Sequence, residues 1–232
     1  MSRPVIIAID GTFASGKGTL AGKLADHYGF DHLDTGRLYR AVAQTVLTRG
    51  GDPDDAATAT GAARTLDIAL LDDPVLKSGP VGAAASRVAM HIPVRQALRD
   101  FQRDFATDTA RKGAVLDGRD IGTVICPDAD VKLYIDAKPE QRAQRRYAEL
   151  TGYGEDITYE SVLTQLRERD HRDSTRAVAP LKPAKDAHLI DTTGLSVDGV
   201  FGQAVRLVDA IMSGSRARRK PPGTGMRSTP DS

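Results

Sequence analysis

The sequence predicts an α/β protein built as one parallel sheet flanked by helices. Short strand-like apolar runs alternate with longer helical patterns along most of the 232 residues, and this alternation is typical of parallel sheets. A glycine-rich segment joins the first apolar run to the first helix. The length suits one domain with a small inserted lobe. Since parallel sheets bind ligands beyond the carboxyl ends of their strands, we expect the functional residues in the loops there.

The expected strands and helices follow one another in regular order. Five apolar runs predict strands, at residues 5–9, 32–34, 114–116, 131–135 and 188–190. Helical patterns lie between and after them, at residues 17–28, 36–48, 94–111, 139–150, 159–173 and 197–212. The first helix is the clearest, because Leu20 and Leu24 share one face and Gly29 stands where a helix often ends. Residues 52–82 are weakly patterned and are the best candidate for an inserted lobe.

The segment between the first strand and the first helix predicts a phosphate-binding loop. It comprises Gly11, Thr12, Phe13, Ala14, Ser15, Gly16, Lys17, Gly18 and Thr19. Glycines let consecutive backbone N–H groups point at a polyphosphate, and the start of the helix adds unpaired donors. Lys17 would place a flexible positive charge at the β- and γ-phosphates of a nucleotide. An ordinary glycine-rich turn is the alternative. Gly18 stands where a hydroxyl residue usually touches magnesium, so the metal ligands stay undetermined.

Two further polar segments come directly after later strands. Asp34 and Thr35 stand as cap residues, and Arg40, one turn into the following helix, would face either the ligand edge of the sheet or solvent. Farther along, Arg119 and Asp120 lie between two glycines. Arg119 would bind a phosphate with two parallel hydrogen bonds. The alternative is a surface ion pair with Asp120, which would contribute little.

A third cluster lies at the end of the helix expected over residues 159–173. Four charged residues recur at the spacing of one helix face, and they are Arg169, Arg172, Asp173 and Arg176. Guanidinium groups on one face repel one another unless an anion lies between them. Because helix-breaking residues follow, this helix would act as a hinged flap over an anion. A solvated charged face is the alternative.

Together these parts suit phosphoryl transfer, which mainly requires positioning and charge neutralisation. The loop lysine would hold the donor, and the separate arginines would hold a second anion. A phosphate monoester acceptor is already an oxyanion near neutral pH, since its second pKa is about 6, so no general base is needed. A protein that uses the loop as a nucleotide-dependent switch is the alternative from another class. It would bind nucleotide without acceptor-dependent turnover.

The composition of the chain bears on disulfides, metal sites, cellular location and the C-terminal tail. A single cysteine, Cys126, excludes a disulfide framework, and the five histidines lack metal-ligand spacing. With no signal-peptide pattern and no long apolar run, we expect a cytoplasmic protein without membrane contact. Residues from Ser213 onward carry five basic side chains against one acidic side chain. Their Gly, Pro, Ser and Arg content predicts a disordered, solvated tail over residues 213–232, and we expect no nucleic-acid partner.

Several motifs, in the same order, make the chain resemble the bacterial cytidylate kinases. The similarity spans about residues 5–212, and the segment DGRDIGT at 117–123 is its most distinctive part. The other matching segments are 9–11, 16–19, 33–36, 39–40, 85–89, 93–95, 169–173 and 176–181. The resemblance implies a P-loop kinase core over residues 1–212. It further implies an acceptor-binding insert at about 52–92 and an arginine-bearing lid at about 152–183.

The same resemblance implies an activity. The protein would be a monomer that transfers the γ-phosphate of ATP, with Mg²⁺, to CMP or dCMP in pyrimidine nucleotide metabolism. Residues 11–19 would bind ATP. The catalytic side chains would be Lys17, Arg119, Arg169, Arg172 and Arg176. The acceptor would contact Thr35, Tyr39, Arg40, Ser86, Arg95, Arg119, Asp120, Arg169, Asp173 and Arg176.

Within the acceptor set, the resemblance implies separate roles. Ser86 and Arg95 would recognise the cytosine edge, while Arg40 and Arg119 would hold the acceptor phosphate. The sugar would contact Arg169 and Asp173, a phosphate would contact Arg176, and Asp120 would support the acceptor site.

Two features depart from the family pattern. Phe13 is bulky where many relatives have proline or a small residue, so the tip of the loop would differ. The segment 66–86 is shorter than in many relatives, whose inserted lobe carries a small sheet. Acceptor discrimination would change as a result, and a kinase acting on UMP or AMP is therefore a second alternative.

Overall fold

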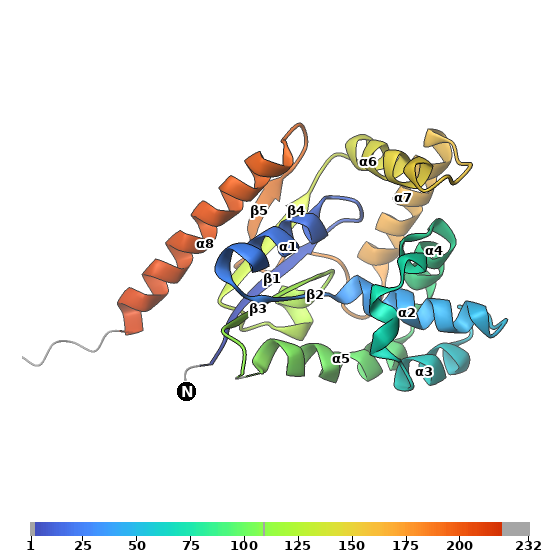
Figure 1. The fold of residues 1–232 in the computed structure, drawn as a ribbon, viewed down its shortest axis with the longest axis horizontal. Helices are drawn as coiled ribbons and strands as arrows, with labels where there is room; N and C mark the ends of the chain where they lie inside the picture. Colours follow the sequence, from blue (N-terminus) through green and yellow to red (C-terminus); the bar gives the residue numbers. More distant parts are fainter. Residues whose placement is uncertain (1–2, 109, 220–232) are drawn as a thin grey trace, which may run out of the picture.

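The computed structural model describes residues 3–108 and 110–219, and it contains one five-stranded parallel sheet (Figure 1). The strands lie in the order β2-β3-β1-β4-β5, and every neighbouring pair is parallel. They are β1 (Val5–Gly11), β2 (Asp31–Asp34), β3 (Gly113–Gly118), β4 (Val131–Asp136) and β5 (His188–Asp191). Each expected strand is present within two residues of its predicted ends, so the predicted fold class is confirmed.

Helices cover both faces of this sheet. They are α1 (Lys17–Tyr28), α2 (Thr35–Thr48), α3 (Ala56–Arg64), α4 (Gly79–Val88), α5 (Ile92–Thr107), α6 (Pro139–Gly152), α7 (Tyr159–Thr175) and α8 (Val197–Arg219). Ile7 and Ile9 of β1 pack with α1 and α8 in one buried cluster. Ile6 and Ala8, which alternate with them, pack in a second cluster with residues of α5 and the β3–β4 connection. A strand buried on both faces is apolar at every position, which explains the unbroken run of β1.

Two helical lobes stand beyond the carboxyl ends of the strands (Figure 1). The expected insert contains α3, α4 and two short turns, Ile68–Asp72 and Pro74–Lys77, and it packs with α2 and α5 around its own apolar cluster. The second lobe pairs α6 with α7, and their cluster includes Phe13 from the glycine-rich loop. The lid expected at 152–183 therefore packs as one unit with α6, and it touches the loop through Phe13.

Helices α8 and α5 differ from their predicted boundaries. Helix α8 continues through Arg219, so the disordered tail was predicted to begin too early, at residue 213. The remaining tail residues, 220–232, lie outside the described residues. Alanine and arginine are good helix formers, and no proline intervenes before residue 221. Helix α5 begins at Ile92, because Pro93 fits the first turn, where its missing N–H costs nothing. It ends at Thr107 rather than at residue 111. None of the described helices has the length and apolarity to cross a membrane.

Candidate active site

A cavity of about 220 Å³ lies where the carboxyl ends of the strands meet the two lobes. It brings together most of the predicted site residues. These are Phe13, Ala14, Gly16, Lys17, Gly18, Thr19, Thr35, Tyr39, Arg40, Ser86, Arg95, Arg119, Asp120, Arg169, Asp173 and Arg176. Residues predicted to hold a donor and residues predicted to hold an acceptor therefore line the same cavity.

The glycine-rich loop wraps the start of α1. Gly11 approaches β4 so closely that an added Cβ would lie 2.0 Å from the Ile135 carbonyl oxygen. Thr12 donates its hydroxyl to Asp136 Oδ1 at 2.7 Å, and Ser15 donates its hydroxyl to the Thr12 carbonyl at 2.9 Å. These three loop residues do not line this cavity, and their hydrogen bonds and close packing hold the loop in shape. Their contact with the donor stays a prediction.

Lys17 begins α1 and faces the other cations of the cavity. Its Nζ donates to the Thr12 carbonyl at 3.4 Å. Burial, and after it the positive charge of Arg119, lower the pKa of Lys17 to about 7. The carboxylates of Asp117 and Asp34 act in the opposite direction, but the pKa stays lowered. An anion bound near Lys17 and Arg119 would reduce the repulsion between these cations, so this part of the cavity is suited to a phosphate.

Asp10 holds the loop that carries Arg119 and Asp120. Its carboxylate accepts the backbone N–H groups of Ile121 and Gly122, both at 2.7 Å. Burial raises the pKa of Asp10 to about 6, against the lowering effect of these two amides. Asp10 thus acts on the β3–β4 connection rather than on the glycine-rich loop that follows it in the chain.

Replacing Asp10 with alanine is expected to lower the free energy of unfolding by about 2 kcal/mol, because two buried amides lose their acceptor. The folded pKa of about 6 lies above the ordinary 3.8. The contribution of Asp10 to stability is therefore full below pH 3.8 and is lost as the pH rises through 6.

Urea unfolding measures this effect, and the variant should lose more of the free energy of unfolding at pH 5 than at pH 7. Asp128→Ala, an exposed position in the same connection, serves as the control, and an equal loss at both pH values would contradict the assignment.

Arg119 and Asp120 do not pair with each other, so the alternative of a surface ion pair between them was wrong. Arg119 Nε donates to Asp173 Oδ2 at 2.9 Å, which links the β3 loop to the lid helix α7. Asp120 is buried and accepts from Arg95 Nη2 at 2.5 Å. Although burial acts to raise it, the guanidinium groups of Arg119 and Arg169 hold the pKa of Asp173 below its ordinary value. The carboxylate of Asp173 therefore orients Arg119, and the carboxylate of Asp120 orients Arg95.

The wall formed by α2 and α5 collects the remaining acceptor candidates. The guanidinium carbon of Arg95 lies 5.7 Å from the centroid of the Tyr39 ring. Arg176 lies beyond the last residue of α7, yet its Nη2 reaches within 3.9 Å of Asp120 Oδ1. A carboxylate between two guanidinium groups keeps both in place. Ser86, on α4, is also buried against this wall.

The flap helix turns only part of its cationic face to the cavity. The guanidinium carbon of Arg169 stacks 4.1 Å from the centroid of the Phe13 ring, and its Nη1 donates to the Gly82 carbonyl at 3.2 Å. Burial, together with the neighbouring arginines, lowers the pKa of Arg169 to about 9. Arg172 does not line the cavity, and its catalytic role stays a prediction. Its Nε lies 3.3 Å from Ser86 Oγ, in an adjoining cavity between α4 and the lid.

Asp117 lines the cavity but was not among the predicted site residues. Asp117, at the end of β3, is only 2% exposed, and an added Cβ on Gly18 would lie 3.7 Å from its Oδ2. Burial and the negative charge of Asp34 raise the pKa of Asp117, while His32 Nε2 lies 2.8 Å from Asp117 Oδ1. The sequence feature that could have identified Asp117 is an apolar strand that ends in an aspartate, because such a strand end lies beside the glycine-rich loop.

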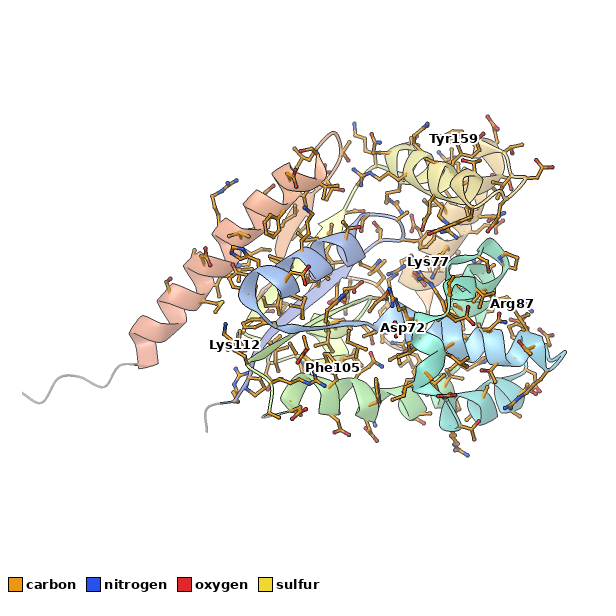
Figure 2. All side chains as sticks on the ribbon, in the orientation of Figure 1. Asp72, Lys77, Arg87, Phe105, Lys112 and Tyr159 are labelled. Carbon is orange, nitrogen blue, oxygen red and sulfur yellow. The ribbon has the colours of Figure 1, made fainter. Side chains whose placement is uncertain are left out.

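Three more charged lining residues come from the lobes, and they are Lys77, Arg146 and Glu149. Lys77 precedes α4 (Figure 2), and its carbonyl accepts from Arg146 Nη2 at 3.3 Å. Arg146 also pairs with Glu149, one turn along α6, at 2.8 Å. The hydrogen bond from Arg146 to Lys77 joins α6 to the insert. Among the described residues, no group of three or more His, Cys, Asp or Glu side chains is arranged to hold a metal ion.

A second cavity of about 350 Å³ lies on the other side of the glycine-rich loop. Leu195, Val197 and Val200 supply apolar surface, and Arg145 supplies a planar cation. Arg145 is held in place because it donates to the Thr192 carbonyl at 2.8 Å. The two cavities share Ala14, Gly16, Thr19, Arg146 and Glu149, so a single elongated ligand can extend from one into the other.

The sequence and the fold are similar to those of known proteins. A family model described as cytidylate kinase matches residues 7–210. The cytidylate kinase of Rhodopseudomonas palustris (strain TIE-1) is 54% identical over 212 residues, covering 91% of this chain and 99% of the relative. That of Xanthobacter autotrophicus (strain ATCC BAA-1158 / Py2) is 55% identical over 210 residues, covering 90% and 100%. An uncharacterized protein from Eubacterium ventriosum ATCC 27560 shares the fold, with a TM-score of 0.52 and 18% identity over 89% of this chain and 99% of that one.

Proposed function

The chain belongs to the cytidylate kinase family, and from this premise we propose that it transfers the γ-phosphate of ATP to CMP and dCMP. One observation carries the proposal. A single cavity is lined by the loop lysine, Lys17, and by arginines from five other parts of the chain. A donor phosphate and an acceptor phosphate bound there would lie end to end. Phosphoryl transfer needs little beyond this positioning and charge neutralisation.

ATP would bind along the glycine-rich loop. Backbone N–H groups of the loop and of the first turn of α1 would hold the β- and γ-phosphates beside Lys17. The adenine would occupy the second cavity, between Arg145 and the apolar side chains of Leu195 and Val197. Stacking on a guanidinium plane and burial against aliphatic groups suit a purine ring.

CMP would bind on the opposite side of the first cavity. Ser86 and Arg95 would recognise the cytosine edge, and Arg40 and Arg119 would hold the phosphate. Burial, and after it the charges of Arg119, Arg40 and Arg146, lower the pKa of Arg169, and a phosphate dianion would neutralise these neighbouring cations. The acceptor oxygen is already ionised near neutral pH, so the protein needs no general base.

Magnesium fits this cavity as a partner of the nucleotide. Asp34 and Asp117 present carboxylates beside Gly18 and Thr19, and hard oxygen ligands are what Mg²⁺ prefers. Two carboxylates are too few to enclose the ion, so they would hold it through water while phosphate oxygens complete its shell. Bound there, Mg²⁺ neutralises charge on the donor phosphates. The protein's own groups orient the nucleotides and exclude water when the lid lies over them.

The decisive experiment measures ADP formation with ATP and Mg²⁺ and with one acceptor at a time. We expect turnover with CMP and dCMP, and little with UMP, AMP or no acceptor. A preference for UMP or AMP would assign the protein to a different nucleoside monophosphate. Nucleotide binding without acceptor dependence would favour a regulatory protein. The family relation extends the proposal to a cytoplasmic monomer, and size-exclusion chromatography tests the oligomeric state.

Replacing Arg95 with alanine is expected to raise the KM for CMP about tenfold or more, with the KM for ATP nearly unchanged, because Arg95 lies on the acceptor side alone. Steady-state kinetics with each substrate varied in turn measure the two effects. Arg99→Ala, one turn further along α5 on its half-exposed side, is the matched control. A loss confined to ATP would contradict the role.

A further inference from the structure

Arg142 is a buried cation outside both cavities described above. It lies on α6, and its side chain is only 3% exposed. Burying a guanidinium group is costly unless its donors find acceptors. The acceptors that Arg142 contacts therefore indicate its structural role.

Its guanidinium group joins three parts of the molecule. Nε donates to the Ala137 carbonyl at 2.8 Å, at the turn that leads from β4 into α6. Nη1 donates to the Phe13 carbonyl at 3.1 Å, at the tip of the glycine-rich loop. Nη1 and Nη2 also bond the two oxygens of Asp170 on α7, at 3.1 and 2.7 Å. A planar fork is required to make these contacts together, and a lysine cannot replace it.

The contact with Phe13 fixes the direction of one peptide group. In a planar trans peptide the carbonyl and the next N–H point in opposite directions. With the Phe13 carbonyl turned to Arg142, the N–H of Ala14 is turned away from it. Ala14 has a φ of 59°, which is unfavourable for a residue with a Cβ. This backbone conformation needs outside support, and Arg142 supplies a bond to it.

The contact with Asp170 fixes the lid against the same loop. Asp170 directly follows Arg169 on α7, so holding Asp170 also places Arg169. The guanidinium carbon of Arg169 stacks 4.1 Å from the Phe13 ring. The backbone of Phe13 thus accepts from Arg142 on α6, while its ring contacts Arg169 on α7. In Figure 1, α6 and α7 lie beside each other above the loop that follows β1.

We propose that Arg142 is a positioning residue, which orients the Phe13–Ala14 peptide for the donor phosphates and couples the lid helix α7 to the glycine-rich loop. It acts through the Phe13 carbonyl and Asp170 and does not touch either nucleotide. The inference deepens the proposed function, since it concerns how the ATP side of that site is held.

The test uses the full-length variants Arg142→Lys and Asp170→Asn. Glu140→Gln is the matched control, because the Glu140–Arg167 pair joins the same two helices on their exposed side. Calorimetry measures the Kd of a non-hydrolysable ATP analogue without CMP, so a failure of the proposed acceptor does not affect it. Steady-state kinetics with CMP and thermal melting complete the set.

For Arg142→Lys we expect the Kd of the analogue to rise about tenfold and kcat to fall by a similar factor, since small displacements of a phosphate site carry such losses. Asp170→Asn, which leaves the Phe13 contact in place, should lower kcat with a smaller change in Kd. Glu140→Gln should change neither. Wild-type Kd and kcat in Arg142→Lys, with or without a lower melting temperature, would overturn the proposal. If Arg142→Lys does not fold, an unchanged kcat in Asp170→Asn overturns the coupling to the lid.

Discussion

Replacing Lys17 with methionine is expected to lower kcat by about a thousandfold, because the transferring phosphate loses its closest positive charge from the loop. Stability should not fall with activity. Burial lowers the pKa of Lys17 to about 7, which means that the ligand-free fold holds this cation at a cost. Methionine has a similar shape and carries no charge, so the melting temperature should be equal or higher.

The measurements are kcat with saturating ATP and CMP, and thermal melting without ligand. Lys23→Met is the matched control, because Lys23 lies on the exposed side of the same helix and pairs with Asp198. Activity close to that of the wild type in Lys17→Met would remove the donor-site assignment. A lower melting temperature would instead show that the lysine stabilises the empty fold.

Replacing Arg119 with lysine is expected to lower kcat about a hundredfold and to raise the KM for CMP. The charge is retained, but lysine cannot bond Asp173 and a phosphate at the same time through a planar fork. Arg119 also lines the same cavity as Lys17, the residue predicted to hold the donor. It is therefore suited to contact the phosphate between donor and acceptor.

Rapid-mixing kinetics separate the chemical step from product release in this variant. Arg87→Lys is a suitable control, because Arg87 lies at the outer side of the insert and pairs with Asp52 and Asp54 (Figure 2). An Arg119→Lys variant with an unchanged kcat would limit Arg119 to orienting the lid through Asp173.

Local patterns were sufficient for the strands, the glycine-rich loop and the first helix. Apolar runs report burial of a strand, and Gly11 and Gly16 report backbone that a Cβ would obstruct or strain. Candidates that follow parallel strands also lie in one cavity, because those strands end at the same edge of the sheet. Lys17 and Arg119 line the same cavity for this reason, although about a hundred residues separate them in the chain.

Such local patterns could not predict which distant side chains pair with each other. Arg119 stands next to Asp120 in the chain, yet it bonds Asp173, and Asp120 bonds Arg95. A helix periodicity placed Arg172 beside Arg169, but only Arg169 lines the cavity.

The amino-acid order therefore established which chemical groups the protein has and at which edge of the sheet they gather. The tertiary structure established which carboxylate orients each guanidinium group, and it gave Asp10, Asp117 and Arg142 their contacts. The reason is physical: periodicity and glycine patterns report the backbone and its burial, which are local. The partner of a buried charge depends on which helices meet above the sheet, and the whole fold determines that.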